Sequence, residues 1–336
     1  MRVAVLGATG NVGTSLLRAL ADDPSVESIV GVSRRRPGLS LPKTTFVQCD
    51  VRSAALPEHL RGLDAVVHLA WLIQPARNQE LVHSVNVDGS RRVFQAVAEA
   101  EVPALVYASS VGAYSPGPKD RMVDESWPTG GIDTSYYAHQ KSQVERELDR
   151  FEGEHPDVRV ARLRPGLIFK REAGSEIRRY FVGPLLPRAL IRPAFLSVVP
   201  DVARLRFQAV HADDVGEAYR RVITSDARGA FNIAAEPVLD PAELGRLLGA
   251  RPVKAPAGLL RGAADLSWRL RLQPTSPGWV DMALAVPLMD ASRARQELGW
   301  TAIRSSREAL LELFDGIRGG AGADTPPLAP GRLRGP

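Results

Sequence analysis

The feature that most constrains the fold is a glycine-rich turn between an apolar segment and a helical segment. "RVAVLG" (residues 2–7) is a continuous apolar run, as expected of a parallel strand that is buried on both faces. "VGTSLLRALADD" (residues 12–23) has apolar residues at helical spacing. Between them, "GATGNVG" places Gly7, Gly10 and Gly13 at G-x-x-G-x-x-G spacing. A strand, a glycine turn and a helix in this order predict the beginning of a βαβ unit.

The same alternation continues through the first half of the chain. Strands alternating with helices predict an α/β fold, a Rossmann-type doubly wound parallel sheet. The expected strands are residues 28–33, 45–50, 64–70, 104–110 and 158–166, and the expected long helices are residues 80–101 and 135–154.

The second half of the chain predicts a smaller, mostly helical C-terminal substrate lobe. We expect a dinucleotide-binding domain over residues 1–169, rejoined by a strand–helix–strand segment at 207–235. The lobe is then built from residues 170–206, which are rich in Arg and Pro, and from the short helical segments of 236–318. Residues 319–336 are rich in Gly and Pro and are expected to be a disordered tail.

Composition narrows the class of protein. With 336 residues, 44% of them hydrophobic and 24% charged, the chain resembles an ordinary soluble protein, and its longest apolar run is too short to span a membrane. The net charge of +5 suits an anionic ligand, but the arginines are scattered and no nucleic-acid-binding signature is present. The histidines and the single cysteine, Cys49, lack metal-ligand spacing. One cysteine also fits a reducing, cytoplasmic location.

The glycine turn is expected to bind the diphosphate of a dinucleotide. A side chain at the turn would block close approach of that group, whereas the helix N-terminus offers free N–H groups and a positive dipole end. The third glycine, Gly13, would let the helix pack close to the strand. The alternative is a tight strand–helix turn without a ligand.

The end of the second expected strand indicates which dinucleotide is bound. An NAD site usually places an acid there for the ribose 2′-OH. Here Ser33 takes that place and Arg34 follows it in "GVSRRRP". Because arginine can bind a 2′-phosphate, we expect NADP(H) to be preferred, with NAD(H) as the alternative, and Ser33 and Arg34 as contacts. A solvated basic loop is the other interpretation. Asp50, at the end of the third strand, could accept a hydrogen bond from the adenine amine.

Eight short motifs together resemble one family. "GATGNVG", "CDV", "HLA", "NVDGS", "YASSVGAY", "YYAHQK", "RPG" and "VHADDV" occur in the order found in extended short-chain dehydrogenases/reductases, the NAD-dependent epimerase/dehydratase-like enzymes. The resemblance covers about residues 1–235. It implies hydride transfer between a nicotinamide and a carbonyl or secondary alcohol, with a Ser–Tyr–Lys triad.

The resemblance selects the members of that triad. It assigns the catalytic hydroxyl to Ser110 rather than Ser109, and the acid/base to Tyr137 of Y-x-x-x-K. Lys141, one helical turn on, is expected to lower the pKa of that phenol from about 10 and to hold the nicotinamide ribose. Asn86 matches an asparagine linked to helix geometry and proton relay. The remaining expected cofactor contacts are Thr9, Asn11, Val12, Val51, Leu69, Ala70 and Pro165, together with Gly7, Gly10, Gly13, Tyr137 and Lys141.

Two departures from the family pattern favour a less polar small-molecule substrate. Val111 and Gly112 follow Ser110, where a sugar 4,6-dehydratase would carry Asp-Glu. Phe207 stands where sugar-nucleotide epimerases tend to place a diphosphate-binding arginine. An NDP-sugar epimerase stays an alternative because arginines occur at 178, 179, 188 and 192. A non-catalytic NADP(H)-binding sensor is the alternative of another class. The protein partner that we expect is a second copy of the chain, in a homodimer.

Overall fold

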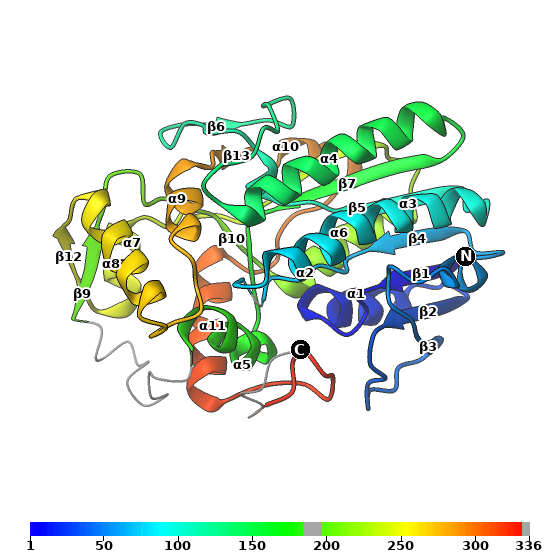
Figure 1. Cartoon of the computed structure of the whole chain (residues 1–336), viewed down its shortest axis with the longest axis horizontal. Coiled ribbons are helices and arrows are strands. Elements are labelled where there is room, and N and C mark those ends of the chain that lie inside the picture. Colours follow the sequence, from blue (N-terminus) through cyan, green and yellow to red (C-terminus); the bar gives the residue numbers. More distant parts are fainter. Residues whose placement is uncertain (75, 184–196, 331–336) are drawn as a thin grey trace.

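A seven-stranded parallel sheet forms the centre of the protein in the computed structural model, which describes residues 1–74, 76–183 and 197–330 (Figure 1). The strand order is β11-β7-β5-β4-β1-β2-β3. Successive strands are added on one side of β1 up to β3 and on the other side from β4 onward, so the order reverses between β1 and β4. Every neighbouring pair in this sheet is parallel, so the expected doubly wound α/β class is confirmed. The strands are β1 (Arg2–Leu6), β2 (Ser28–Ser33), β3 (Thr44–Gln48), β4 (Ala65–His68), β5 (Ala104–Ala108), β7 (Arg159–Pro165) and β11 (Gly229–Ile233).

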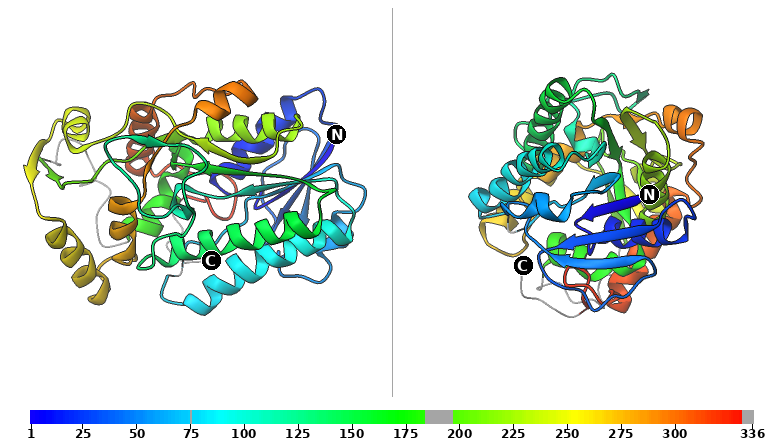
Figure 2. Two further views of the ribbon diagram at one scale, coloured as in Figure 1. Left: turned by 90° about the horizontal axis from the view of Figure 1, so that it is seen from above. Right: turned by 90° about the vertical axis from the view of Figure 1, so that its right-hand side faces the viewer.

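Helices cover both faces of this sheet (Figure 2). Successive side chains of a strand point to opposite faces. Val3 and Val5 of β1 accordingly join one buried cluster, whereas Ala4 and Leu6 join the other. The first face is covered by α1 (Asn11–Asp22) and α6 (Ala212–Ile223), and the second by α3 (Gly89–Glu99) and α4 (Tyr136–Glu154).

The remaining strands form three short parallel pairs outside the main sheet. The segment after residue 206 therefore divides, because β10 pairs with β8 while α6 and β11 return to the main sheet. The pairs are β8 (Leu167–Phe169) with β10 (Ala209–His211), β9 (Val198–Asp201) with β12 (Arg251–Lys254), and β6 (Met122–Val123) with β13 (Leu288–Met289).

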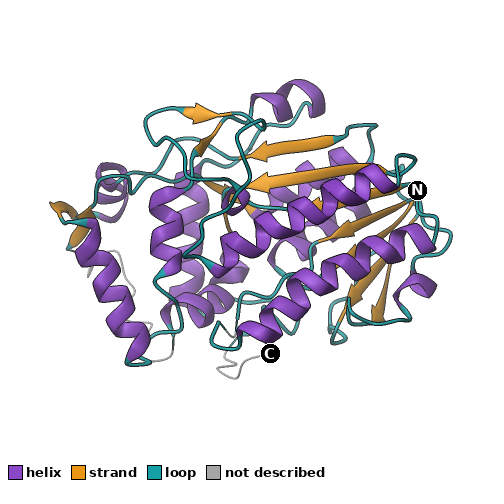
Figure 3. Ribbon diagram, turned by 45° about the horizontal axis from the view of Figure 1, so that its top comes forward, coloured by secondary structure: helices purple, strands orange, loops and turns teal. Residues whose placement is uncertain are grey.

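The lobe lies beyond the carboxyl ends of the main strands (Figures 1 and 3). One helix of the expected lobe segment belongs elsewhere, since α10 packs on β11 and α6, and Trp300 after it donates to the carbonyl of Asp214. No helix in the described ranges is long and apolar enough to cross a membrane. The other helices are α2 (Gln79–His83), α5 (Gly174–Ile177), α7 (Pro241–Leu248), α8 (Ala257–Arg269), α9 (Gly278–Ala285), α10 (Ser292–Leu298) and α11 (Ser306–Gly319).

The C-terminal segment differs from the expected disordered tail over its described part. Residues 321–330 follow α11 and return along the molecule, and Leu328 is fully buried. The amide of Ala323 donates to the carbonyl of Leu328 at 3.1 Å, which closes the segment on itself. A Gly- and Pro-rich composition disfavours helices and strands, but it does not prevent an apolar side chain from anchoring a loop. Residues 331–336 lie outside the described part.

Candidate active site

A cavity of ≈360 Å³ opens at the carboxyl ends of the central strands, where the strand order reverses. Ligands of doubly wound sheets bind at this point of the fold. The cavity collects residues from the glycine turn, from the ends of β2 and β4, and from the segment after β3. The expected cofactor residues that line it are Gly7, Thr9, Gly10, Ser33, Arg34, Val51, Leu69 and Ala70.

The three glycines of the turn differ in whether protein packing requires them. Gly7 has a φ of +85°, and a Cβ there would lie 2.8 Å from the amide nitrogen of Ala70. A Cβ on Gly13 would lie 2.4 Å from the carbonyl oxygen of Gly7, so α1 packs as close to the strand as expected. A Cβ on Gly10 would meet only the Gly7 oxygen, at 3.5 Å. Protein packing therefore does not require Gly10, whose bare backbone lines the cavity and leaves room for a diphosphate at the α1 N-terminus.

The end of the cavity that lies next to the carboxyl end of β2 is basic. Arg34 and Arg35 line it, and Ser33 donates from its hydroxyl to the carbonyl of Arg35 at 2.9 Å. Asp50 does not line the cavity. Its carboxylate accepts two hydrogen bonds from the guanidinium of Arg52, at 2.9 and 3.0 Å. The hydrogen bond from Arg52 is the main reason that the pKa of Asp50 is lowered. The carboxylate of Asp50 is thus held in an ion pair with Arg52.

Six more expected cofactor residues also lie outside the cavity lining. The amide nitrogen of the Asn11 side chain donates to the carbonyl of Ile168 at 3.2 Å, which joins α1 to β8. Pro165 ends β7 and is paired with Ile233 of β11. The six residues are Asn11, Val12, Gly13, Pro165, Tyr137 and Lys141.

The structure brings the three expected triad residues together from two elements. Ser110 follows β5, and its hydroxyl accepts from the amide of Gly112 at 3.0 Å. Tyr137 and Lys141 lie on the first turns of α4, which begins where the Ser135 hydroxyl accepts from the amide of Ala138. The Ser110 hydroxyl lies close enough to the Tyr137 phenol to favour its ionised form, although burial outweighs this effect. Tyr137 and Lys141 share one face of α4, as residues four apart on a helix do.

The electrostatics of Tyr137 differ from the expectation. Burial raises the pKa of this phenol, and the nearby Ser110 hydroxyl opposes that rise only in part. The ammonium of Lys141 donates to the carbonyl of Ala108 at 2.6 Å, and it lies 6.0 Å from the centre of the Tyr137 ring. Burial lowers the pKa of Lys141 well below its usual value, with Glu145 opposing. Because Lys141 is directed at Ala108 and both groups are buried, the phenol stays protonated here.

The neighbouring tyrosine has a separate structural role. The hydroxyl of Tyr136 donates to the carbonyl of Ile73 at 2.6 Å. Asn86 fixes the same segment, since its amide exchanges hydrogen bonds of 2.7 and 2.9 Å with the backbone of Leu72 and donates to Gln140 at 2.9 Å. Both residues therefore hold the chain that follows β4, and none of these hydrogen bonds reaches the triad.

Aromatic rings enclose the Tyr137 side chain. The ring of Trp279, from α9, lies 4.9 Å from the Tyr137 ring, and Phe181 packs edge-on against Trp279 at 4.9 Å. Trp71 approaches Tyr137 edge-on at 6.0 Å, and its ring lies 3.5 Å from the ammonium of Lys141. No sequence motif marks Trp279 or Phe181, because only tertiary packing brings them to α4.

The lobe and the C-terminal segment add cavity residues, of which the sequence singled out only Arg179. Glu176, Arg179 and Tyr180 line the cavity from α5 and the turn after it, and Pro326 and Pro327 line it from the C-terminal segment. Burial raises the pKa of Glu176 to about 7, with the positive charge of Arg179 opposing. No local motif marks these positions.

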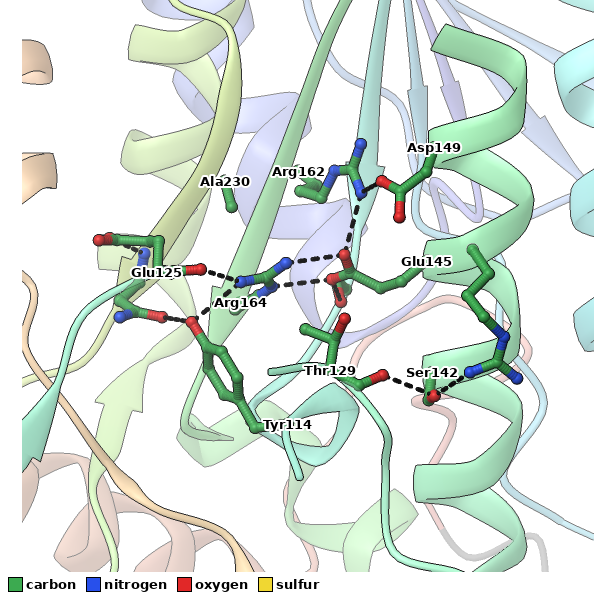
Figure 4. A network of polar contacts seen from close by, with 12 residues as sticks. Tyr114, Glu125, Thr129, Ser142, Glu145, Asp149, Arg162, Arg164 and Ala230 are labelled. Atoms are coloured by element: carbon green, nitrogen blue, oxygen red, sulfur yellow. Dashed lines mark hydrogen bonds and ion pairs between the residues drawn. The ribbon is translucent and has the colours of Figure 1, made fainter. Parts of the chain in front are cut away.

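A buried network of charged side chains is centred on Glu145 and Arg164 (Figure 4). Glu145, one turn after Lys141, accepts two hydrogen bonds of 2.8 Å from Arg164 and one of 3.1 Å from Arg162. It also accepts a hydrogen bond of 2.5 Å from Ser109, the neighbour of Ser110. Burial opposes ionisation of Glu145, but Arg164, Arg162 and Ser109 outweigh it and lower its pKa to about 2. The network therefore connects α4 to the turn that carries Ser110.

The side chain of Phe207 packs into a hydrophobic cluster with Ala209 and Leu239. Its neighbour Arg206 donates to the carbonyl of Lys119 at 2.8 Å. Neither side chain lines the cavity. Of the four arginines that keep an epimerase open as an alternative, Arg179 lines the cavity and Arg178 is buried. The other two, Arg188 and Arg192, lie outside the described residues. Among residues 1–74, 76–183 and 197–330, no group of three or more His, Cys, Asp or Glu side chains is placed to hold a metal ion.

The chain is similar to known proteins over most of its length. A profile described as "NAD dependent epimerase/dehydratase family" matches residues 3–234. An uncharacterized protein of Mycobacterium tuberculosis is 26% identical over 325 residues, which are 96% of this chain and 31% of that protein. The chain thus spans less than a third of the length of that relative. L-arabinose 1-dehydrogenase (NAD(P)(+)) of Haloferax volcanii is 41% identical over 110 residues, 32% of this chain and 41% of the enzyme.

A similar structure is the UDP-glucose 4-epimerase of Thermus thermophilus in complex with NAD. It superimposes with a TM-score of 0.68 at 21% identity and covers 96% of this chain and 100% of its own. At this level of identity the likeness concerns the fold.

Proposed function

Because the chain belongs to the NAD dependent epimerase/dehydratase family, we propose that it is an oxidoreductase that uses NADP(H) in preference to NAD(H). The reaction is hydride transfer between the nicotinamide and a ketone, an aldehyde or a secondary alcohol of low polarity. The observation that carries the proposal is the meeting of Ser110, Tyr137 and Lys141. Trp71, which lines the cavity, contacts both Tyr137 and Lys141.

The cavity residues fit a dinucleotide. Gly10 leaves the α1 N-terminus open to a diphosphate, and the basic end with Arg34 and Arg35 suits a 2′-phosphate. When bound, the nicotinamide supplies or accepts the hydride. Lys141, near the end of β5, is the candidate for holding the nicotinamide ribose. To reach the ribose, its ammonium would leave the face of Trp71, which covers it in the structure.

Tyr137 moves the proton at the substrate oxygen. Its raised pKa keeps the phenol protonated at neutral pH, so it is poised to donate a proton to a carbonyl oxygen that gains a hydride. Ser110 lies beside this phenol and orients the same substrate oxygen.

The aromatic surroundings of Tyr137 support a substrate of low polarity. A substrate that reaches the phenol would lie against the rings of Trp71 and Trp279, which provide apolar faces and exclude water. Phe207, packed in the lobe, supplies no positive charge for a nucleotide diphosphate. These observations favour a carbonyl compound without a nucleotide over an NDP-sugar.

The test combines binding and turnover. Thermal unfolding with NADPH, NADH, UDP and TDP should give the largest stabilisation with NADPH, and ligand at about 100 times its Kd adds about 2.7 kcal/mol. NADPH oxidation should then be followed with a panel of aldehydes and ketones. A clear shift with UDP or TDP would restore the epimerase alternative. NADPH binding without oxidation by any carbonyl would favour the sensor alternative.

A further inference from the structure

The described part of the C-terminus is fastened across the molecule rather than along one element. We call residues 321–330 the C-terminal strap. It is attached to α5, where the amide of Ser175 donates to the carbonyl of Ala321 at 3.2 Å. Its centre is anchored by Leu328, which is fully buried, and by Thr325, which is 2% exposed. A chain segment that merely lay on the surface would not bury its apolar side chain.

The strap lies beside the basic end of the cavity. Pro326 and Pro327 line the same cavity as Gly10 and Arg34. The carboxylate of Asp324 rests against Gly38, in the loop after β2, so closely that a Cβ on Gly38 would lie 2.1 Å from a carboxylate oxygen. In a doubly wound sheet the ribose of the adenosine half is read at the end of β2. The strap therefore borders the adenosine half of the cavity.

Arg179 connects the strap to the cavity. This side chain lines the cavity from the turn after α5. Its guanidinium donates to the strap carbonyls of Ala329, at 3.0 Å, and Pro327. A guanidinium has five N–H donors, so donors are left over for an anion in the cavity. Arg179 is thus shared between the strap and the space that Arg34 and Arg35 border.

We propose that the C-terminal strap is a wall of the dinucleotide site, which packs Pro326 and Pro327 against the adenosine half and slows release of the cofactor. The inference rests on the proposed function, because the ligand is taken to be NADP(H). Prolines suit this role because they present rigid apolar faces with little conformational entropy to lose. The strap must open for the adenosine half to leave, so its attachment sets the dissociation rate.

The test detaches the strap without changing a cavity residue. Leu328→Asp places a carboxylate where a fully buried leucine anchors the strap. Stopped-flow dissociation of NADPH should become about tenfold faster or more, and 2′,5′-ADP, which carries only the adenosine half, should lose affinity by a similar factor. Leu311→Asp, at an exposed position of α11, is the matched control and should change neither value. Leu328→Met keeps an apolar side chain at this position and should release NADPH at the wild-type rate.

A second variant protects the test against misfolding of the first. Pro326→Ala/Pro327→Ala alters only the wall and should speed NADPH release about threefold. If folded Leu328→Asp and the double variant both release NADPH within twofold of wild type, the strap is not part of the site. If the wild-type protein binds neither NADPH nor 2′,5′-ADP, the proposed function itself fails, which is a distinguishable result.

Discussion

Replacing Glu145 with glutamine removes a buried negative charge that lies between the guanidinium groups of Arg162 and Arg164. The side chain of Glu145 is 1% exposed and those of both arginines are 6% exposed. Glutamine keeps the shape and can still accept from Ser109, so the change is mainly one of charge. Breaking a buried ion pair by removing one partner costs about 3–5 kcal/mol. The lowering of the pKa from 4.5 to about 2 corresponds to about 3 kcal/mol at neutral pH. We therefore expect Glu145→Gln to lower the free energy of unfolding by about 3 kcal/mol at pH 7.

The pH dependence gives this prediction a sign. A carboxyl whose pKa is lower in the folded state stabilises the fold above its unfolded pKa and loses that contribution as the pH falls through its folded pKa. For Glu145 the window runs from 4.5 down to about 2. The difference between wild type and Glu145→Gln should be constant above about pH 5.5 and smaller by about 1.4 kcal/mol at pH 3.5.

The assay is urea unfolding of both proteins at pH 7, 4.5 and 3.5. Glu147→Gln is the matched control, because Glu147 lies on the same helix and pairs with Arg91 and Arg150, whose side chains are 41% and 65% exposed. That variant should cost less than about 1 kcal/mol, as exposed pairs do. A loss below 1 kcal/mol for Glu145→Gln, or a loss that grows as the pH falls, would refute the reasoning.

Three further predictions concern the site. Tyr137→Phe should lower single-turnover hydride transfer by about 10²–10⁴-fold with NADPH affinity little changed, whereas Tyr136→Phe, which loses a bond to a backbone carbonyl, should stay within a few-fold; full activity of Tyr137→Phe would exclude the phenol as acid/base. Arg34→Ala should weaken NADPH by about 1.5–3 kcal/mol and NADH much less, measured by fluorescence titration. Arg36→Ala, which does not line the cavity, is its control, and equal losses for both cofactors would contradict the 2′-phosphate assignment. Trp71→Phe should remove most of the change in tryptophan fluorescence on NADPH binding, since Trp71 lines the cavity and covers Lys141; an unchanged signal would show that another tryptophan reports binding.

Local sequence determined the framework of this protein. Continuous apolar runs, helical periodicity and the glycine turn each depend on residues that are close in sequence, so they predicted the parallel sheet and the strand–turn–helix order at its start. Gly13 is an example, because its packing against Gly7 depends on a spacing of six residues. The shared face of Tyr137 and Lys141 follows from helix geometry alone in the same way.

Tertiary structure decided what surrounds that framework. Trp279 contacts Tyr137, and Pro326 lines the same cavity as the glycine turn. Both pairs are so far apart in sequence that no local pattern encodes them. The electrostatics follow the same division. The spacing of Tyr137 and Lys141 suggested a lowered phenol pKa, but burial, which only the assembled fold produces, raises it. A pKa depends on desolvation and on all nearby charges, so it is a property of the packed site and not of a motif.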